Sequence, residues 1–246
     1  NGTTVFTIAD GGNVGVGTSA PSSTLHVVGK STFNGITPTL VATISTDSSS
    51  QATGSGGVML DVQGNYAYVI NPVVSTMQIF DISTPTSPTL ISTTSGVGNS
   101  AIAVQGHYAY TAAECGNLII VDVSNPYLPV LRGQASISSC AEGIFVSGKY
   151  VHIPGILGGG VDNIIDVSNP DAPVNVGTFA NGYNATDIYV QGNYAYGTGL
   201  RSIYDISNPA SITRVFTTAT AMAGNVAVEG RYAYGGSGLE FRVIDI

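Results

Sequence analysis

Carboxylates are the groups of this chain with the clearest potential for chemistry. The sequence holds 15 Asp and Glu residues, and five of the aspartates recur at one position of a repeated pattern. An acid that every repeat carries is better explained as a turn-fixing acceptor than as a catalytic group. Three carboxylates lie outside the pattern: Glu114, Glu142 and Asp187. Of the acids in the chain, their expected placement is nearest to that of the two catalytic carboxylates of a glycosidase. The chain has no Trp to stack a sugar and no recognisable catalytic motif, so we predict that it is not an enzyme.

Other reactive groups are few. The three histidines, His26, His107 and His152, share no ligand spacing, so we expect no metal site. The sequence has no phosphate-binding glycine loop and no nucleophile elbow, and we expect no cofactor.

A fivefold repeat must position these groups. The pattern V-x-G-x-Y is followed each time by an apolar strand that ends in Asp. The leading valines are Val62, Val104, Val146, Val190 and Val228, and the aspartates are Asp81, Asp122, Asp166, Asp205 and Asp245. Repeats of about 40 residues that consist of short strands are typical of β-propeller blades.

One repeat contains the strands of one blade. Residues 101–105 alternate in hydrophobicity, and Gly106-His107 then predicts a hairpin turn because Gly supplies a positive φ. A third strand is predicted over 118–123 and a fourth over 129–136, with a proline turn between them. Each unit is therefore expected to form four antiparallel strands.

The fifth repeat has no fourth strand, because the sequence ends at Ile246. A matching segment, P-T-L-V-A-T-I-S, lies upstream of the first repeat at Pro38 to Ser45. We predict an all-β, five-bladed propeller over residues 37–246, closed by this N-terminal outer strand paired with Glu240 to Ile246.

The repeat resembles a known family. The pattern G-N-Y-A-Y-V, followed by L-x-I-V-D-V-S-N-P, is similar to the LVIVD repeat of bacterial and archaeal surface or secreted propellers. The resemblance covers residues 38–246 and implies the fold, while the biochemical activity of the family is poorly defined. That family often carries an Asp three residues before the valine, and here only Asp187 matches.

Residues 1–36 lie outside the repeat and predict a β-hairpin followed by a short strand. They resemble the G-N-V-G-I-G-T…L-H-V segment of phage tail fibres and large bacterial surface fibres, which is commonly part of an intertwined, often trimeric β shaft. A segment below about 40 residues rarely buries enough surface to fold alone. We therefore expect self-association through this extension. The candidate assembly residues are Val5, Phe6, Ile8, Val14, Val16, Leu25 and Val27.

The predicted loops of one propeller face are rich in Gly, Ser, Asn and Ala, which suits hydrogen bonding to sugars or packing against a neighbour. Ordinary solvated loops are the alternative. The candidate binding residues on this face are Glu114, Glu142, Tyr183 and Asp187. Cys115 and Cys140 fall in adjacent loops of the same rim, so we predict a disulfide worth about 3 kcal/mol. Such a bond indicates a compartment outside the cytoplasm.

Charge and composition limit the partners. Seven basic residues against 15 acidic ones give a net charge of −8, which argues against nucleic-acid binding. No apolar run has the length of a membrane span, so we expect no membrane insertion. The chain begins at Asn1 without a methionine, and we expect a processed product or a fragment.

Three hypotheses follow. The first is an extracellular subunit of a surface fibre or filament, at a cell surface or on a virion, that binds copies of itself through residues 1–36. The second is a glycan- or receptor-binding adhesin, with a surface glycan as its partner. A carbohydrate-active enzyme is the third.

Overall fold

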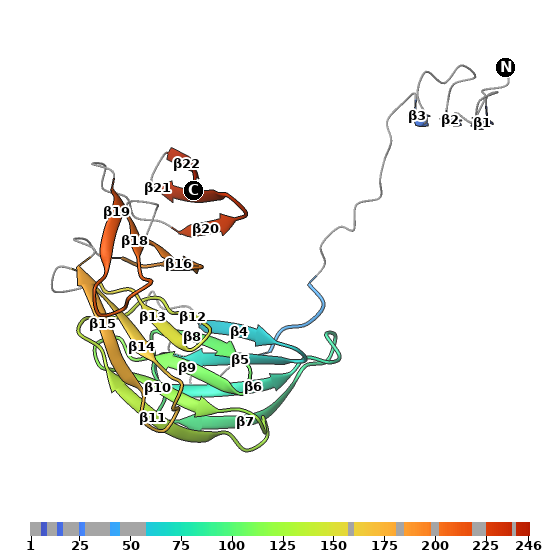
Figure 1. The fold of residues 1–246 in the computed structure, drawn as a ribbon. Coiled ribbons are helices and arrows are strands. Elements are labelled where there is room, and N and C mark those ends of the chain that lie inside the picture. Colours follow the sequence, from blue (N-terminus) through green and yellow to red (C-terminus); the bar gives the residue numbers. More distant parts are fainter. Residues whose placement is uncertain are drawn as a thin grey trace. The chain divides into compact units, whose positions relative to one another are not determined.

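The computed structural model describes ten stretches of the chain: residues 6–8, 14–16, 25–27, 40–44, 58–156, 160–180, 185–197, 202–217, 225–237 and 240–246. The chain divides into two compact units, Asn1–Val41 and Ala42–Ile246. All regular structure in the described part is β-strand (Figure 1).

The described residues of the small unit form three short strands: β1 (Phe6–Ile8), β2 (Val14–Val16) and β3 (Leu25–Val27). Strands β1 and β2 pair antiparallel, with Phe6 opposite Val16, as the predicted hairpin requires. Strand β3 joins β2 in parallel, with Val14 opposite Leu25. Six of the seven candidate assembly residues lie in these strands, and Val5 lies outside the described residues.

In its described residues the large unit contains five antiparallel sheets, one for each repeat. Four sheets have four strands and the last has three, and the chain passes through each sheet in order (Figure 1). The strands are β4 (Met59–Gln63), β5 (Tyr66–Asn71), β6 (Thr76–Asp81) and β7 (Thr89–Ser95) in the first blade; β8 (Ala101–Gln105), β9 (Tyr108–Ala112), β10 (Asn117–Asp122) and β11 (Val130–Ser136) in the second; β12 (Phe145–Ser147), β13 (Tyr150–Ile153), β14 (Val161–Asp166) and β15 (Val174–Ala180) in the third; β16 (Ile188–Gln191), β17 (Tyr194–Gly197), β18 (Ser202–Asp205) and β19 (Thr213–Thr217) in the fourth; and β20 (Val226–Glu229), β21 (Tyr232–Ser237) and β22 (Glu240–Asp245) in the fifth. The predicted all-β, five-bladed fold is therefore confirmed.

Two local devices recur in the blades. The hairpin glycine of every repeat has a positive φ, for example +62° at Gly106, which residues with a Cβ rarely adopt. The repeated aspartate accepts a hydrogen bond from the backbone amide two residues later, at 2.8 to 3.0 Å, in four blades: Asp81, Asp122, Asp166 and Asp205. Hydrogen bonds from a serine hydroxyl and amide lower the pKa of Asp81, Asp122 and Asp205, and the Lys149 ammonium and Ser168 lower the pKa of Asp166 to about 2. These residues are the turn-fixing acceptors that the repeat predicted.

Neighbouring blades pack through apolar cores. Each blade has a front face, which carries Tyr68 and Ile79 in the first blade, and a back face, which carries Leu60 and Val62 there. The front face of one blade packs on the back face of the next: Tyr68 and Ile79, for instance, share a buried cluster with Ile102 and Val121 of the second blade. Three further clusters join blades two to five in the same way.

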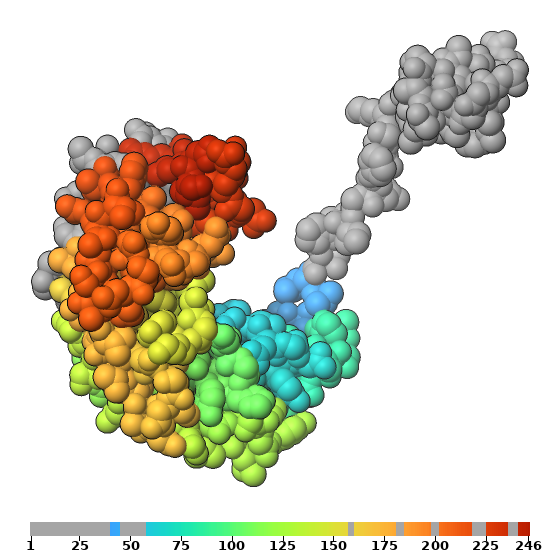
Figure 2. All heavy atoms as spheres, viewed as in Figure 1, coloured from blue at the N-terminus to red at the C-terminus, as the bar shows by residue number. Residues whose placement is uncertain are grey.

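The predicted closing pair is not formed. Among the described residues β22 pairs only with β21, and residues 40–44 form no strand. Instead, Ala42 and Ile44 line a hollow of about 370 Å³ together with Leu60, Phe80 and Pro88 of the first blade. Residues 42–44 thus lie against the back face of the first blade, and the space-filling view shows this blue segment beside the cyan first blade (Figure 2). The prediction that Pro38 to Ser45 pairs with Glu240 to Ile246 is therefore wrong for residues 40–44, the described part of that segment.

Candidate functional site

The predicted disulfide is confirmed. Cys115 lies in the turn between β9 and β10, and Cys140 lies in the connection between β11 and β12. The two Cα atoms are 4.0 Å apart. Cys115 is exposed and Cys140 is buried, so the bond fixes a surface turn of the second blade to the connection that leads into the third blade.

Two candidate binding residues flank this disulfide. Glu114 precedes Cys115, and its carbonyl accepts a hydrogen bond of 2.6 Å from the Ala141 amide. Its own amide donates to the Asn99 side chain at 3.1 Å. Glu142 follows Ala141 in the chain, and both glutamate side chains are exposed. The structure therefore brings Glu114 and Glu142 to one junction between the second and third blades, which we call the disulfide junction.

Backbone hydrogen bonds extend this junction toward the fourth blade. The Ile156 amide donates to the Cys140 carbonyl at 2.8 Å, and the Ala185 amide donates to the Gly155 carbonyl at 3.2 Å. Gly155 has no space for a side chain, because a Cβ there would overlap the Ser139 hydroxyl and the Val161 carbonyl. The described loops of three blades are thus held to one another by backbone hydrogen bonds.

Asp187 lies elsewhere, at the junction of the fourth and fifth blades. It is half-buried, and its Oδ2 accepts a hydrogen bond of 2.9 Å from the Val226 amide of the fifth blade. Its Oδ1 accepts from the Ile188 amide at 3.0 Å. Burial raises the pKa of Asp187, and these two hydrogen bonds oppose that effect. The geometry gives Asp187 a role in joining blades, while Tyr183 lies outside the described residues.

Other blade-joining groups were missed in the sequence. Asp61 Oδ2 accepts from the Val104 amide at 2.6 Å, across the first and second blades. The Gln63 side chain bonds both backbone groups of Gly106, at 2.7 and 2.8 Å, and Gln191 donates to the Gly230 carbonyl at 3.0 Å. The glutamine of V-Q-G could have indicated these contacts from the sequence. A polar residue that recurs beside a turn can bond the same backbone group in each repeat, and here Gln63 and Gln191 bond the hairpin glycine of the next blade.

The sequence pattern also did not identify His152 as a buried histidine. It occupies the site of Tyr68, Tyr110, Tyr196 and Tyr234 in the other blades, and it is 1% exposed. Its Nδ1 has no hydrogen-bond partner within the described ranges. Burial lowers the pKa of His152 to about 4, so the imidazole is neutral at physiological pH.

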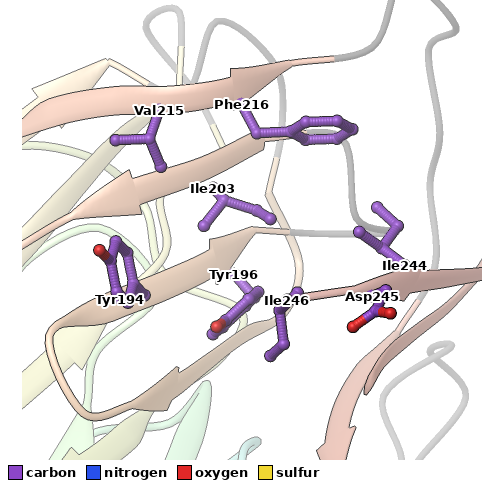
Figure 3. Close-up of a pocket in the computed structure, with 8 residues that line it drawn as sticks. All are labelled: Tyr194, Tyr196, Ile203, Val215, Phe216, Ile244, Asp245 and Ile246. Carbon is purple, nitrogen blue, oxygen red and sulfur yellow. The ribbon is translucent and has the colours of Figure 1, made fainter. Parts of the chain in front are cut away.

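The remaining surface offers an apolar hollow of about 340 Å³ between the fourth and fifth blades (Figure 3). Tyr194, Tyr196 and Ile203 line it together with Val215 and Phe216 of β19 and the end of β22. Its one carboxylate, Asp245, accepts hydrogen bonds from the Arg231 guanidinium. The hollow therefore suits an apolar partner better than a charged substrate.

Two kinds of site are absent from the described residues. No group of three or more His, Cys, Asp or Glu residues that the structure describes could hold a metal ion. Within the same residues, no helix has the length and hydrophobicity to cross a membrane.

Solved structures resemble this chain in fold. A functionally unknown protein from Desulfotomaculum acetoxidans matches with a TM-score of 0.64 at 16% identity, over 76% of this chain and 65% of that one. BamB from Moraxella catarrhalis matches with a TM-score of 0.54 at 14% identity, over 77% and 57%. A protein named as a candidate 6-phosphogluconolactonase from Bacteroides uniformis matches with a TM-score of 0.56 at 15% identity, over 64% and 53%. The chain thus spans less than two thirds of the length of each, and these identities show the fold alone.

Comparison with family models is more specific. No curated protein matches the sequence. The LVIVD repeat matches five times, at residues 58–95, 99–136, 140–181, 182–220 and 221–246, one match for each blade. Because these matches cover most of the chain, the protein belongs to the LVIVD repeat family.

Proposed function

We propose that this protein is a non-enzymatic, extracellular subunit of a surface fibre or filament, which displays its propeller as an interaction module. The disulfide between Cys115 and Cys140 supports the location, because disulfides persist in oxidising compartments and are rare in the cytosol. The likeness to a protein named as a candidate lactonase rests on fold, and folds of this kind host many unrelated functions.

The observation that carries the proposal is the separate small unit. Residues 1–41 form a compact unit of their own, and its strands β1, β2 and β3 contain three residues each. A unit of this size rarely buries enough apolar surface to be stable alone, and small sheets with free edges are completed by partner strands. Copies of the same unit are the partners that best fit this requirement.

The propeller is suited to display. Its carboxylates Asp61, Asp81 and Asp187 hold turns or neighbouring blades in place. The disulfide junction fixes the loops of the second and third blades. Loops held in this way lower the entropy cost of binding a partner, because fewer groups are ordered on association.

The experiment compares the assembly state of three full-length proteins by light scattering and negative-stain microscopy. The unmodified chain should form assemblies well above its 25.1 kDa mass. Val16→Asp in β2 should reduce the size of the assemblies, because a charge is inserted into the strand that both other strands contact. Tyr127→Asp, in an exposed turn of the propeller, is the matched control and should leave assembly unchanged. Equal assembly of all three proteins, or a monomeric unmodified chain, would contradict the proposal.

A second candidate function is glycan or receptor binding at the disulfide junction. The specific observation in its favour is the pair of exposed carboxylates, Glu114 and Glu142, on a junction held by backbone hydrogen bonds, since carboxylates accept hydrogen bonds from sugar hydroxyls. In a glycan-array measurement, Glu114→Gln and Glu142→Gln should each weaken binding. Glu229→Gln, an exposed acid of the fifth blade, is the control that should not.

A further inference from the structure

The two cysteines of the disulfide differ in their access to solvent. Cys115 is exposed, whereas Cys140 is 7% exposed and precedes Ala141, which belongs to the core between the second and third blades. In thiol–disulfide exchange, a thiolate attacks one sulfur and expels the other as a thiolate. A reagent from solvent therefore reaches the bond at Cys115, and Cys140 is the leaving group.

Backbone hydrogen bonds hold the leaving group in place. The Ala141 amide donates to the Glu114 carbonyl at 2.6 Å, and the Ile156 amide donates to the Cys140 carbonyl at 2.8 Å. Neither bond involves a sulfur atom, so neither has to break when the disulfide opens. The freed Cys140 thiolate thus stays beside Cys115 and can displace an attached reagent at high effective concentration. Burial also disfavours its charge, which makes Cys140 a poor leaving group.

Negative charge flanks the accessible end of the bond. Glu114 directly precedes Cys115, Glu142 follows Cys140 by two residues, and both glutamates are exposed. Exposed carboxylates are ionised at neutral pH. Neither glutamate takes part in the ion pairs that the described part of the chain forms. An incoming thiolate is itself negative, so the two carboxylates repel it as it approaches Cys115.

We propose that the disulfide is a charge-selective site of thiol exchange: the reagent bonds to Sγ of Cys115, and Glu114 and Glu142 disfavour reagents in proportion to their negative charge. In the first step a thiolate forms a mixed disulfide with Cys115, the bond between the cysteines breaks, and Cys140 leaves as a thiolate. In the second step another thiolate removes the reagent as a symmetrical disulfide, and Cys115 leaves as a thiolate. Both protein thiolates then take up protons from water. The reductant is a small thiol, and two molecules of it are oxidised for each bond reduced.

The selectivity has a consequence for the disulfide junction. Anionic thiols reduce the bond slowly, and Cys140 reverses the first step, so the loops of the second and third blades stay linked in their presence. A thiol without net charge meets no such electrostatic barrier. The inference concerns the chemistry of the bond and needs neither a fibre nor a glycan, so it can fail separately from both proposed functions.

The test compares the rates at which three thiols reduce the full-length protein. The attacking forms of mercaptoethanesulfonate, mercaptoethanol and cysteamine are doubly negative, singly negative and net neutral. With about 8 Å between charges in dilute buffer, Glu114→Gln and Glu142→Gln should each speed reduction by mercaptoethanesulfonate about fourfold and by mercaptoethanol about twofold, and leave cysteamine unchanged. These differences should disappear at about 1 M salt, where the screening length is about 3 Å. Glu229→Gln, an exposed acid of the fifth blade, is the matched control and should change no rate.

A second measurement locates the first step. The protein is treated briefly with mercaptoethanol, free thiols are alkylated, and mass spectrometry identifies the modified cysteines. We expect the mercaptoethanol adduct on Cys115 and the alkyl group on Cys140. An adduct on Cys140, or on both cysteines alike, overturns the proposed attack at Cys115. Rates that rise equally for all three thiols in the two glutamate variants, or do not rise at all, overturn the proposed charge selectivity.

Discussion

His152 should make the protein sensitive to mild acid. Its imidazole is buried at a position where the other blades carry Tyr, and burial lowers its pKa from 6.5 to about 4. In the unfolded chain the pKa returns to its ordinary value. Well above pH 6.5 the residue is neutral in both states and has no effect. As the pH falls toward 4, the unfolded state takes up a proton that the folded state rejects, and the free energy of unfolding decreases.

The size of the effect follows from the shift. One pKa unit corresponds to about 1.4 kcal/mol, so the full loss on acidification is about 3 kcal/mol. Between about pH 7.5 and about pH 5 the expected loss is about 2 kcal/mol, since the folded state is still neutral there. His152→Tyr restores the residue of the other repeats and removes this titration.

The assay is urea unfolding of the unmodified chain and of His152→Tyr at both pH values. The unmodified chain should lose about 2 kcal/mol more stability than the variant. His107→Asn is the matched control, because His107 is exposed in a hairpin turn where two other repeats carry Asn. It should behave as the unmodified chain does. Equal losses for the unmodified chain and His152→Tyr would refute the argument, as would an NMR titration of His152 near its ordinary pKa.

Three other changes test the loop face and the blade junctions. Replacing Cys115 and Cys140 together by Ser should lower the free energy of unfolding by about 3 kcal/mol in denaturant titrations, and an unchanged midpoint would contradict the proposed stabilisation. Gly155→Ala should cost about 1–3 kcal/mol by the same measurement, because its Cβ meets backbone and a short side chain; neutrality would show that the loops can move apart. Asp187→Ala should cost about 1–3 kcal/mol, since the Val226 amide loses its acceptor, and calorimetry should show a lower Tm.

Local features of this protein were predictable from the sequence because they repeat. The hairpin glycines and the repeated aspartates each occur five times in the sequence, so a chance pattern is a poor explanation for them. The disulfide was predictable because the repeat places Cys115 and Cys140 in adjacent loops of one rim. Each of these features depends on a few residues that are close in the sequence or in the repeat, so the repeated pattern predicts it.

Features that depend on the whole arrangement of blades were not predictable in the same way. The spacing of the repeats predicts the number of blades. The angle between neighbouring blades is set by side-chain packing in four separate cores, which the spacing does not predict. The pairing of residues 38–45 therefore could not be settled from the matching sequence alone. Asp187 likewise looked like a free carboxylate, because its acceptor role depends on an amide 39 residues away.

The cross-link between Cys115 and Cys140 has a mechanical consequence for a protein under tension. A pulling force applied at the two ends of the polypeptide passes through the sulfur bridge and bypasses the 25-residue separation that it spans. At about 3.3 Å for each extended residue, those residues would otherwise add about 80 Å of length on rupture. The segment that contains β10 and β11 is thereby covalently shielded from stretching, and elongation under tension is confined to the rest of the chain.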